Sequence, residues 1–145
     1  MTGVWIVLAT LALGTMIGVV RLRRDGRVRA AGDGRLAEGD LGAPLGERAT
    51  LVQFSTAFCQ PCRATRRVLA DVSALVPGVS HVEIDAESRL DLVRRLDIMR
   101  TPTVLVLDGL GIIVKRASGQ PRKADVLAAL GDAVSHDPSH DSDEK

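Results

Sequence analysis

Apolar residues dominate the first twenty positions of the chain and then give way to mixed patterns. No side chain from Met1 to Val20 is charged, and the segment from Val4 to Val20 is predominantly apolar. An α-helix needs about 20 apolar residues to cross a hydrocarbon layer of ~30 Å. Residues 1–20 therefore predict a single transmembrane helix.

The next segment, residues 21–49, has no clear period. It is rich in Gly, Ala and charged residues, as expected for a loop or linker. We interpret it as a basic stalk followed by a Gly-rich linker, in which a short strand lies at 27–31 or at 41–45.

From Thr50 onward, strand and helix patterns alternate. Residues 50–55 and 79–85 predict strands, and between them apolar positions recur at helical spacing until Pro77-Gly78. A short helix around residues 92–96 precedes an apolar strand at 103–107. Residues 108–111 then predict a hairpin turn into a strand at 112–117, and a last amphipathic helix ends near Val134.

The order βαβαββα predicts an α/β fold over residues 50–135, with a central mixed β-sheet flanked by helices. We expect the first strands, which are joined through helices, to be parallel and the last hairpin to be antiparallel. Residues 136–145 form a polar tail without periodicity and predict disorder. His136 and His140 lie in this tail and are expected to be solvated.

Charge places the predicted domain relative to the membrane. Six arginines follow the apolar run within residues 1–35, against two aspartates, and no Lys or Arg precedes it. A cleaved signal peptide has the opposite order. By the positive-inside rule, the domain should be cytoplasmic. The arginines are Arg21, Arg23, Arg24, Arg27, Arg29 and Arg35.

The same charge distribution disfavours nucleic-acid binding. Residues 1–35 carry a net charge of +4 and the whole chain +1, so the remainder carries −3. The arginines are not interleaved with aromatic residues, as a nucleic-acid surface would favour. In the apolar run, Gly14 and Gly18 form a GxxxG pattern that would allow a weak helix dimer.

The candidate chemistry lies in Cys59-Gln60-Pro61-Cys62, which contains the two cysteines of the chain. Two thiols three positions apart on a first helical turn lie on one face and can close a disulfide. The positive end of the helix dipole lowers the pKa of a thiol placed there, which makes Cys59 the predicted nucleophile and Cys62 the resolving thiol. Pro61 is compatible with the first turn because the N–H that it lacks would have no intrahelical partner.

A CxxC pattern has three other uses in proteins. Covalent haem attachment requires His after the second Cys, but Arg63 follows here. A structural zinc site needs four ligands, and only His81, His136 and His140 could add to the two thiols. A purely structural disulfide would close so small a loop that it would stabilise little. Zinc and a structural disulfide stay as weaker alternatives, and no metal is predicted.

Over residues 50–134 the chain resembles the thioredoxin family. The resemblance rests on landmarks in order: a strand leading into Phe58-Cys59-Gln60-Pro61-Cys62, the strand Val82-Glu83-Ile84-Asp85, the step Thr101-Pro102-Thr103, the turn Asp108-Gly109, and Gly119 before the last helix. It implies a thioredoxin-like fold and a redox-active Cys59–Cys62 pair.

The resemblance also implies a substrate site. Pro102 would be a cis proline facing the cysteines, and the Thr101 backbone would pair with an extended substrate segment. The substrate-binding residues are then expected to be Phe58, Gln60, Pro61, Thr101 and Gly119.

Gln53 departs from the family pattern. Thioredoxins usually have a buried Asp at the position that it matches, which serves the proton needs of the inner cysteine. An amide cannot take a proton, so Cys62 would need water or another group. The candidates for a proton relay to Cys62 are therefore Gln53 together with His81 and Glu83 of the second strand. The alternative is that His81 and Glu83 are ordinary exposed residues near a strand end.

The favoured function is a membrane-tethered thiol–disulfide oxidoreductase that reduces protein disulfides. Its partners would be disulfide-containing proteins, an upstream thiol reductant and the membrane, and no organic cofactor is implied. The alternatives are an outward-facing thiol oxidase or reductase of the cytochrome-maturation type and a non-catalytic binding module with the same fold.

Overall fold

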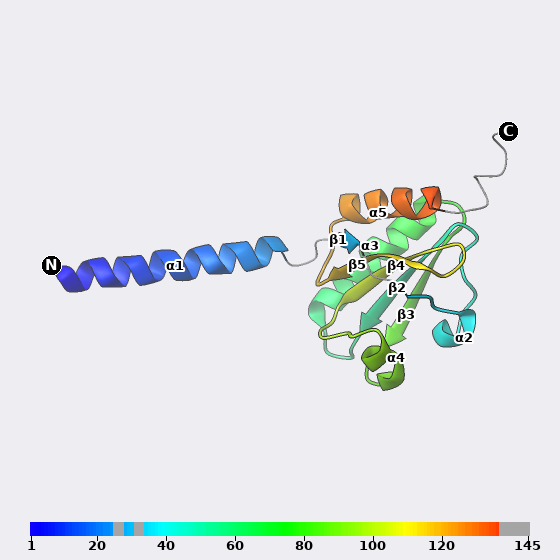
Figure 1. Ribbon diagram of the computed structural model, residues 1–145, viewed down its shortest axis with the longest axis horizontal. Helices are drawn as coiled ribbons and strands as arrows, with labels where there is room; N and C mark the ends of the chain where they lie inside the picture. Colours follow the sequence, from blue (N-terminus) through cyan, green and yellow to red (C-terminus); the bar gives the residue numbers. More distant parts are fainter. Residues whose placement is uncertain (25–27, 31–33, 137–145) are drawn as a thin grey trace.

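A computed structural model describes residues 1–24, 28–30 and 34–136 of the chain (Figure 1). From β2 onward its elements follow the predicted order βαβαββα. The elements are α1 (Thr2–Arg24), β1 (Val28–Ala30), α2 (Glu38–Leu41), β2 (Ala49–Ser55), α3 (Gln60–Leu75), β3 (Val79–Asp85), α4 (Leu90–Arg95), β4 (Thr103–Asp108), β5 (Ile113–Ser118) and α5 (Lys123–Ser135).

The strands form one mixed five-stranded sheet in the order β1-β5-β4-β2-β3. β2 and β3 are parallel, and β4 is antiparallel to both β2 and β5. The expectation that all helix-linked strands are parallel is wrong for β4. β4 instead joins β2 on the side opposite β3 and runs in the reverse direction, so the connection through α4 is not a parallel crossover.

Each face of the sheet covers a separate core. Val52 and Phe54 of β2 point to one face, where they pack with Ile84, Leu92 and neighbouring residues beside α4. Leu51 points to the opposite face, where α3 and α5 lie over the sheet (Figure 1). Because side chains alternate along a strand, β2 contributes to both cores and is buried along its whole length.

The segment predicted as a linker contributes to the fold, so its assignment as residues 21–49 is wrong in part. Leu36 is fully buried and Leu41 nearly so, both in the core beside α4. The Leu36 amide donates to the Gly111 carbonyl at 2.9 Å, and β1 extends the sheet by pairing with β5. The strand expected at 27–31 or 41–45 lies at Val28–Ala30, and Leu41 instead ends α2.

The hairpin between β4 and β5 lies at one end of the strands, and this end is the hairpin edge of the sheet. Oδ1 of the buried Asp108 accepts hydrogen bonds from the Leu110 and Ile112 amides, each at 2.9 Å. Gly111 has a φ of +83°, and a Cβ there would lie 2.2 Å from the Leu36 carbonyl oxygen. The turn therefore needs glycine both for its backbone angle and for space.

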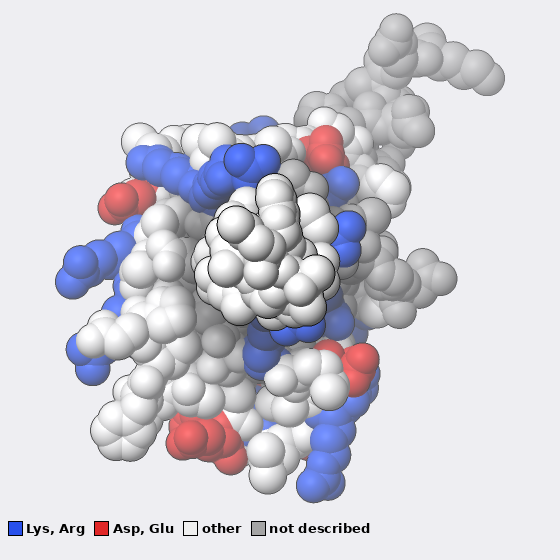
Figure 2. Space-filling view, turned by 90° about the vertical axis from the view of Figure 1, so that its left-hand side faces the viewer, with Lys and Arg blue, Asp and Glu red and all other residues white. Residues whose placement is uncertain are grey.

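α1 extends away from the sheet, and none of its residues is buried (Figure 1). Its 23 residues make it the one helix among the described residues that is long and apolar enough to cross a membrane. Figure 2 looks along α1, and the end that faces the viewer carries no charged side chain. The basic residues Arg21, Arg23 and Arg24 stand in its last turn, at the end nearer the sheet.

Part of the predicted tail lies outside the described residues. α5 ends at Ser135 and His136 is its exposed C-cap, whereas residues 137–145, including His140, are not described.

Candidate active site

The two cysteines lie where β2 gives way to α3. β2 ends at Ser55, and α3 begins at Gln60, three residues earlier than the Arg63 region that the sequence pattern suggests. Cys59 is the N-cap of α3 and forms a disulfide with Cys62. Cys59 is half-buried, and Cys62 is 1% exposed. Attack from outside can therefore involve only the first sulfur directly.

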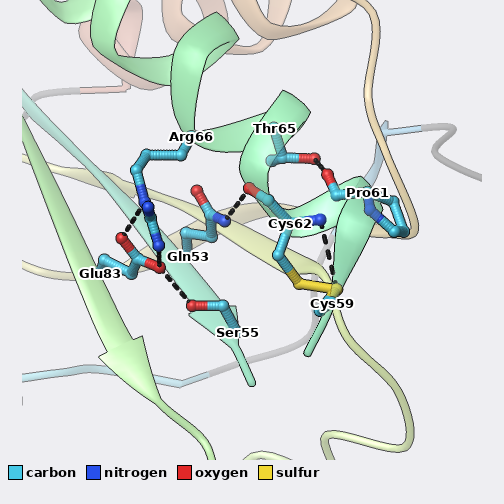
Figure 3. A network of polar contacts seen from close by, with 8 residues as sticks. All are labelled: Gln53, Ser55, Cys59, Pro61, Cys62, Thr65, Arg66 and Glu83. Atoms are coloured by element: carbon cyan, nitrogen blue, oxygen red, sulfur yellow. Dashed lines mark hydrogen bonds and ion pairs between the residues drawn. A yellow bond between two sulfur atoms is a disulfide. The ribbon is translucent and has the colours of Figure 1, made fainter. Parts of the chain in front are cut away.

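The start of α3 provides a donor for the outer sulfur. The Cys62 amide donates to Cys59 Sγ at 3.2 Å. Unpaired amides at a helix N-terminus favour an anion, so this contact would stabilise a Cys59 thiolate after reduction. Pro61 occupies the first turn, and its carbonyl accepts from the buried Thr65 hydroxyl at 2.9 Å (Figure 3).

A second loop lies at the same end of the sheet as the cysteines. Thr103 of β4 pairs with Phe54 of β2, which brings Thr101 and Pro102 beside the end of β2. The Thr101–Pro102 peptide bond is cis. The Pro102 carbonyl accepts from the Gly119 amide at 2.7 Å, and Gly119 has a φ of +97°. Pro102 itself is buried, so it forms the floor of this edge.

Two large apolar side chains are exposed in the loops that precede α3 and β4. Phe58 is 98% exposed and Met99 is 83% exposed, one on each of the two loops. Gln60 and Pro61 are also exposed. The sequence reasoning missed Met99, although an apolar residue three positions before Pro102 was a signal for it. Of the predicted substrate-binding residues, Phe58, Gln60 and Pro61 adjoin the cysteines in the sequence, and the Thr101 hydroxyl lies 3.4 Å from that of Thr56 at the same end of the sheet.

Gln53 lies directly beneath the inner cysteine. Its side chain is fully buried, and Nε2 donates to the Cys62 carbonyl at 2.8 Å (Figure 3). Its Oε1 has no hydrogen-bond partner among the described residues. The amide therefore fixes the backbone of Cys62, but it offers no group that could accept the proton of the thiol.

Glu83 of β3 pairs with Gln53 of β2, and its carboxylate is held by two partners. Arg66 of α3 forms a two-pronged ion pair with its carboxylate, and the Ser55 hydroxyl donates to it (Figure 3). The hydrogen bonds from Arg66, followed by the one from Ser55, hold the pKa of Glu83 below its ordinary value despite partial burial. Glu83 is therefore ionised near neutral pH. Sequence reasoning missed Arg66, seven positions after Cys59 on α3.

His81 is farther from the disulfide. It pairs with Leu51, whereas Glu83 pairs with Gln53, so His81 lies two residues farther from the reactive edge, about 7 Å along the strand. Burial lowers the pKa of His81, and its Nε2 has no hydrogen-bond partner among the described residues. It is neutral near pH 7 but does not line the space beside the cysteines.

A cavity of about 180 Å³ opens beside the disulfide. It brings both cysteines together with the polar groups of β2, β3 and α3. Within the described part of the chain, no group of three His, Cys, Asp or Glu side chains could hold a metal. The cavity is lined by Ser55, Thr56, Ala57, Cys59, Cys62, Arg63, Arg66, Glu83 and Asp85.

Comparisons with known proteins agree with this geometry. A family model described as Thioredoxin matches residues 43–132. Thioredoxin H4-1 of Oryza sativa subsp. japonica is 31% identical over 85 residues, which cover 58% of this chain and 65% of the relative. Thioredoxin H5 of the same plant is matched over only 44% of its length. The chain thus spans less than two thirds of these two relatives.

Solved structures show the same fold. Thioredoxin NaTrxh from Nicotiana alata has 25% sequence identity and a TM-score of 0.53, over 60% of this chain and 74% of that one. Chloroplastic thioredoxin z has 24% identity and a TM-score of 0.55, over 61% and 80% of the two chains. α1 has no place in the region matched by the family model.

Proposed function

This chain belongs to the thioredoxin family, and on that premise we propose that it is a membrane-tethered thiol–disulfide oxidoreductase that reduces protein disulfides. The family and the disulfide-bonded CxxC support the general activity. The observation that carries the proposal is the asymmetry of the pair: Cys59 is accessible and faces a helix N-terminal amide, whereas Cys62 is buried behind it. Reduction by a dithiol donor would release both thiols.

In the proposed reaction, the Cys59 thiolate attacks one sulfur of a substrate disulfide. A Cys59–substrate disulfide forms, the substrate S–S bond breaks, and the leaving sulfur departs as a thiolate that takes a proton from water. The Cys62 thiolate then attacks Cys59 Sγ, which restores the Cys59–Cys62 disulfide and releases the second substrate thiol. Two electrons pass to the substrate, and a second dithiol protein must return them.

We expect several of the described residues to take part in this reaction. Thr101, Pro102 and Gly119 border the place where an extended substrate segment would lie, and Phe58 and Met99 would contact its apolar side chains. Because Gln53 cannot accept a proton, we expect the Cys62 proton to leave through water in the cavity beside it. The reaction requires no metal or organic cofactor, since sulfur atoms carry the electron pair.

The membrane tether and its orientation belong to the same proposal. α1 supports an anchor by its length, its apolar surface and its lack of burial. Its last turn is basic, which by the positive-inside rule favours a cytoplasmic domain. In that reducing compartment the pair would act as a reductase.

Two measurements test the proposal. Purified full-length protein, supplied with a dithiol donor, should reduce a protein disulfide, and Cys59→Ser should abolish the activity. Absence of activity in the wild type would reject the enzyme in favour of a binding module. In intact cells carrying the chain, a membrane-impermeant thiol reagent should leave Cys59 unmodified. Modification would favour the outward-facing alternative.

A further inference from the structure

The anchor and the disulfide lie at the same edge of the sheet. Val28 pairs with Ala117, Ala117 with Val104, and Val104 with Gln53, so these four residues form one row across the sheet. Gln53 bonds the Cys62 carbonyl directly. The chain that leaves α1 therefore enters the domain in the row that lies beneath the redox site.

The connection between α1 and this row is short. Only three residues separate Arg24 from Val28, so the two Cα atoms are at most about 14 Å apart. The four helical residues after Val20 add about 6 Å beyond the apolar run. Val28 thus cannot lie more than roughly 20 Å from the hydrocarbon layer if α1 spans the membrane.

The lateral distance to the disulfide is also small. β1 and β2 are separated by three strand spacings in the sheet, or about 14 Å. The hairpin after β4 lies at the opposite end of the strands, about 20 Å farther along them. The end of the strands that carries the disulfide, the redox edge, is therefore the end tied to α1, and the hairpin edge is the free end.

We propose that the active site faces the membrane and that its substrates are disulfides of membrane proteins held close to the bilayer surface. The proposal rests on the proposed function, both for the anchor and for disulfide exchange. The exposed apolar side chains of Phe58 and Met99 on this edge suit a partner segment that is itself partly apolar. Electrons would come from a soluble dithiol donor, which can approach whenever the membrane substrate has left.

The height of the site can be measured directly. Full-length protein with Cys62→Ser keeps Cys59 as its single thiol, which is labelled with a fluorophore. A matched control carries Cys59→Ser, Cys62→Ser and Leu110→Cys, because Leu110 is 43% exposed in the hairpin at the opposite edge. Both are placed in phosphatidylcholine vesicles that contain a nitroxide-headgroup lipid.

We expect the label at Cys59 to be quenched several-fold more strongly than the label in the hairpin. Equal quenching, or stronger quenching in the hairpin, would overturn the proposed orientation. A protein that fails to float with the vesicles would overturn the anchor itself.

The substrate class has a separate test. Wild-type protein in vesicles receives a single-span peptide whose disulfide lies next to the bilayer, the same peptide with a long spacer before its disulfide, and a soluble disulfide peptide. The membrane-proximal disulfide should be reduced fastest. A flexible Gly-Ser insertion of about 20 residues after Arg24, with an end-to-end length of about 25 Å, should remove that preference.

The outcomes separate the two proposals. If no disulfide is reduced, the proposed function fails. If all three are reduced at equal rates, disulfide exchange stands, while the membrane-proximal substrate class is rejected in favour of soluble partners.

Discussion

The two ends of the sheet contrast in what their side chains contact, although each has a buried oxygen without a partner among the described residues, Asp108 Oδ2 at one end and Gln53 Oε1 at the other. At the hairpin edge, the buried Asp108 caps two backbone amides, and Leu36 closes the turn from the N-terminal segment. At the redox edge, large apolar side chains are exposed.

Because of this difference, we expect substitutions at one end to change the free energy of unfolding and substitutions at the other to change the rate of disulfide exchange. Contacts at the hairpin edge are buried and join the N-terminal segment to the turn between β4 and β5, so their loss should affect folding. The redox edge is arranged around a bond that must break and form again. Changes there should affect reactivity more than the free energy of unfolding.

Leu36→Ala is expected to give the largest effect. Leu36 is fully buried, and truncation of a buried Leu costs about 2–5 kcal/mol in the free energy of unfolding. Chemical denaturation would measure the loss. Leu75→Ala, at a residue that is 62% exposed, is the control and should change little. Equal stabilities for the two variants would mean that residues before β2 are indeed a linker.

Asp108→Ala should follow in size. It leaves two backbone amides without their acceptor, a cost of about 2 kcal/mol. Asp108→Asn keeps an acceptor oxygen and should lose less, as thermal unfolding would show. The rate of disulfide reduction by the folded fraction should be unchanged in both variants. A changed rate would break the separation between the two edges.

Gln53→Asp should change chemistry more than stability. It removes the hydrogen bond to the Cys62 carbonyl, worth about 1 kcal/mol, and places a carboxyl in a buried position where its pKa is raised. That carboxyl can accept the Cys62 proton, so kcat/KM should acquire an additional dependence on pH. Gln53→Asn, which cannot titrate, is the control. Identical pH profiles for the two would contradict the assigned role.

Glu83→Gln should have the smallest effect on stability. Arg66 lowers the pKa of Glu83 in the folded protein, so this carboxylate stabilises the fold above its ordinary pKa of 4.5 and loses that contribution as the pH falls through its folded value. The difference in Tm between wild type and variant should therefore be present at pH 7 and vanish on acidification. A difference that grows on acidification would contradict the pairing.

Strong local patterns made most of the fold predictable. The periodic segments after Thr50 gave the correct order of strands and helices, because their apolar faces are buried against the sheet. Leu36 and Leu41 escaped prediction because they stand among glycines and charges with no period. The direction of β4 also escaped prediction, because the alternation of strand and helix patterns does not fix whether a strand reached through a short helix runs parallel or antiparallel to its neighbour.

The part of the site whose reactive residues are close together in the sequence could be predicted. The cysteines and Pro61 lie in one tetrapeptide, and Pro102 follows from the resemblance. Arg66 was missed because its pairing with Glu83 of β3 depends on tertiary structure. The positions of the three candidates for proton transfer also depend on the fold. Gln53 contacts Cys62, Glu83 lines the cavity, and His81 does neither.

Trapping of mixed disulfides distinguishes the roles of the two cysteines. Full-length protein with Cys62→Ser can attack a substrate disulfide but cannot resolve the product, so it should accumulate covalent partners that a thiol reductant releases. Cys59→Ser should trap none, because Cys62 is buried. Equal trapping by the two variants, or none by either, would contradict the account of Cys59 as nucleophile and Cys62 as resolving thiol.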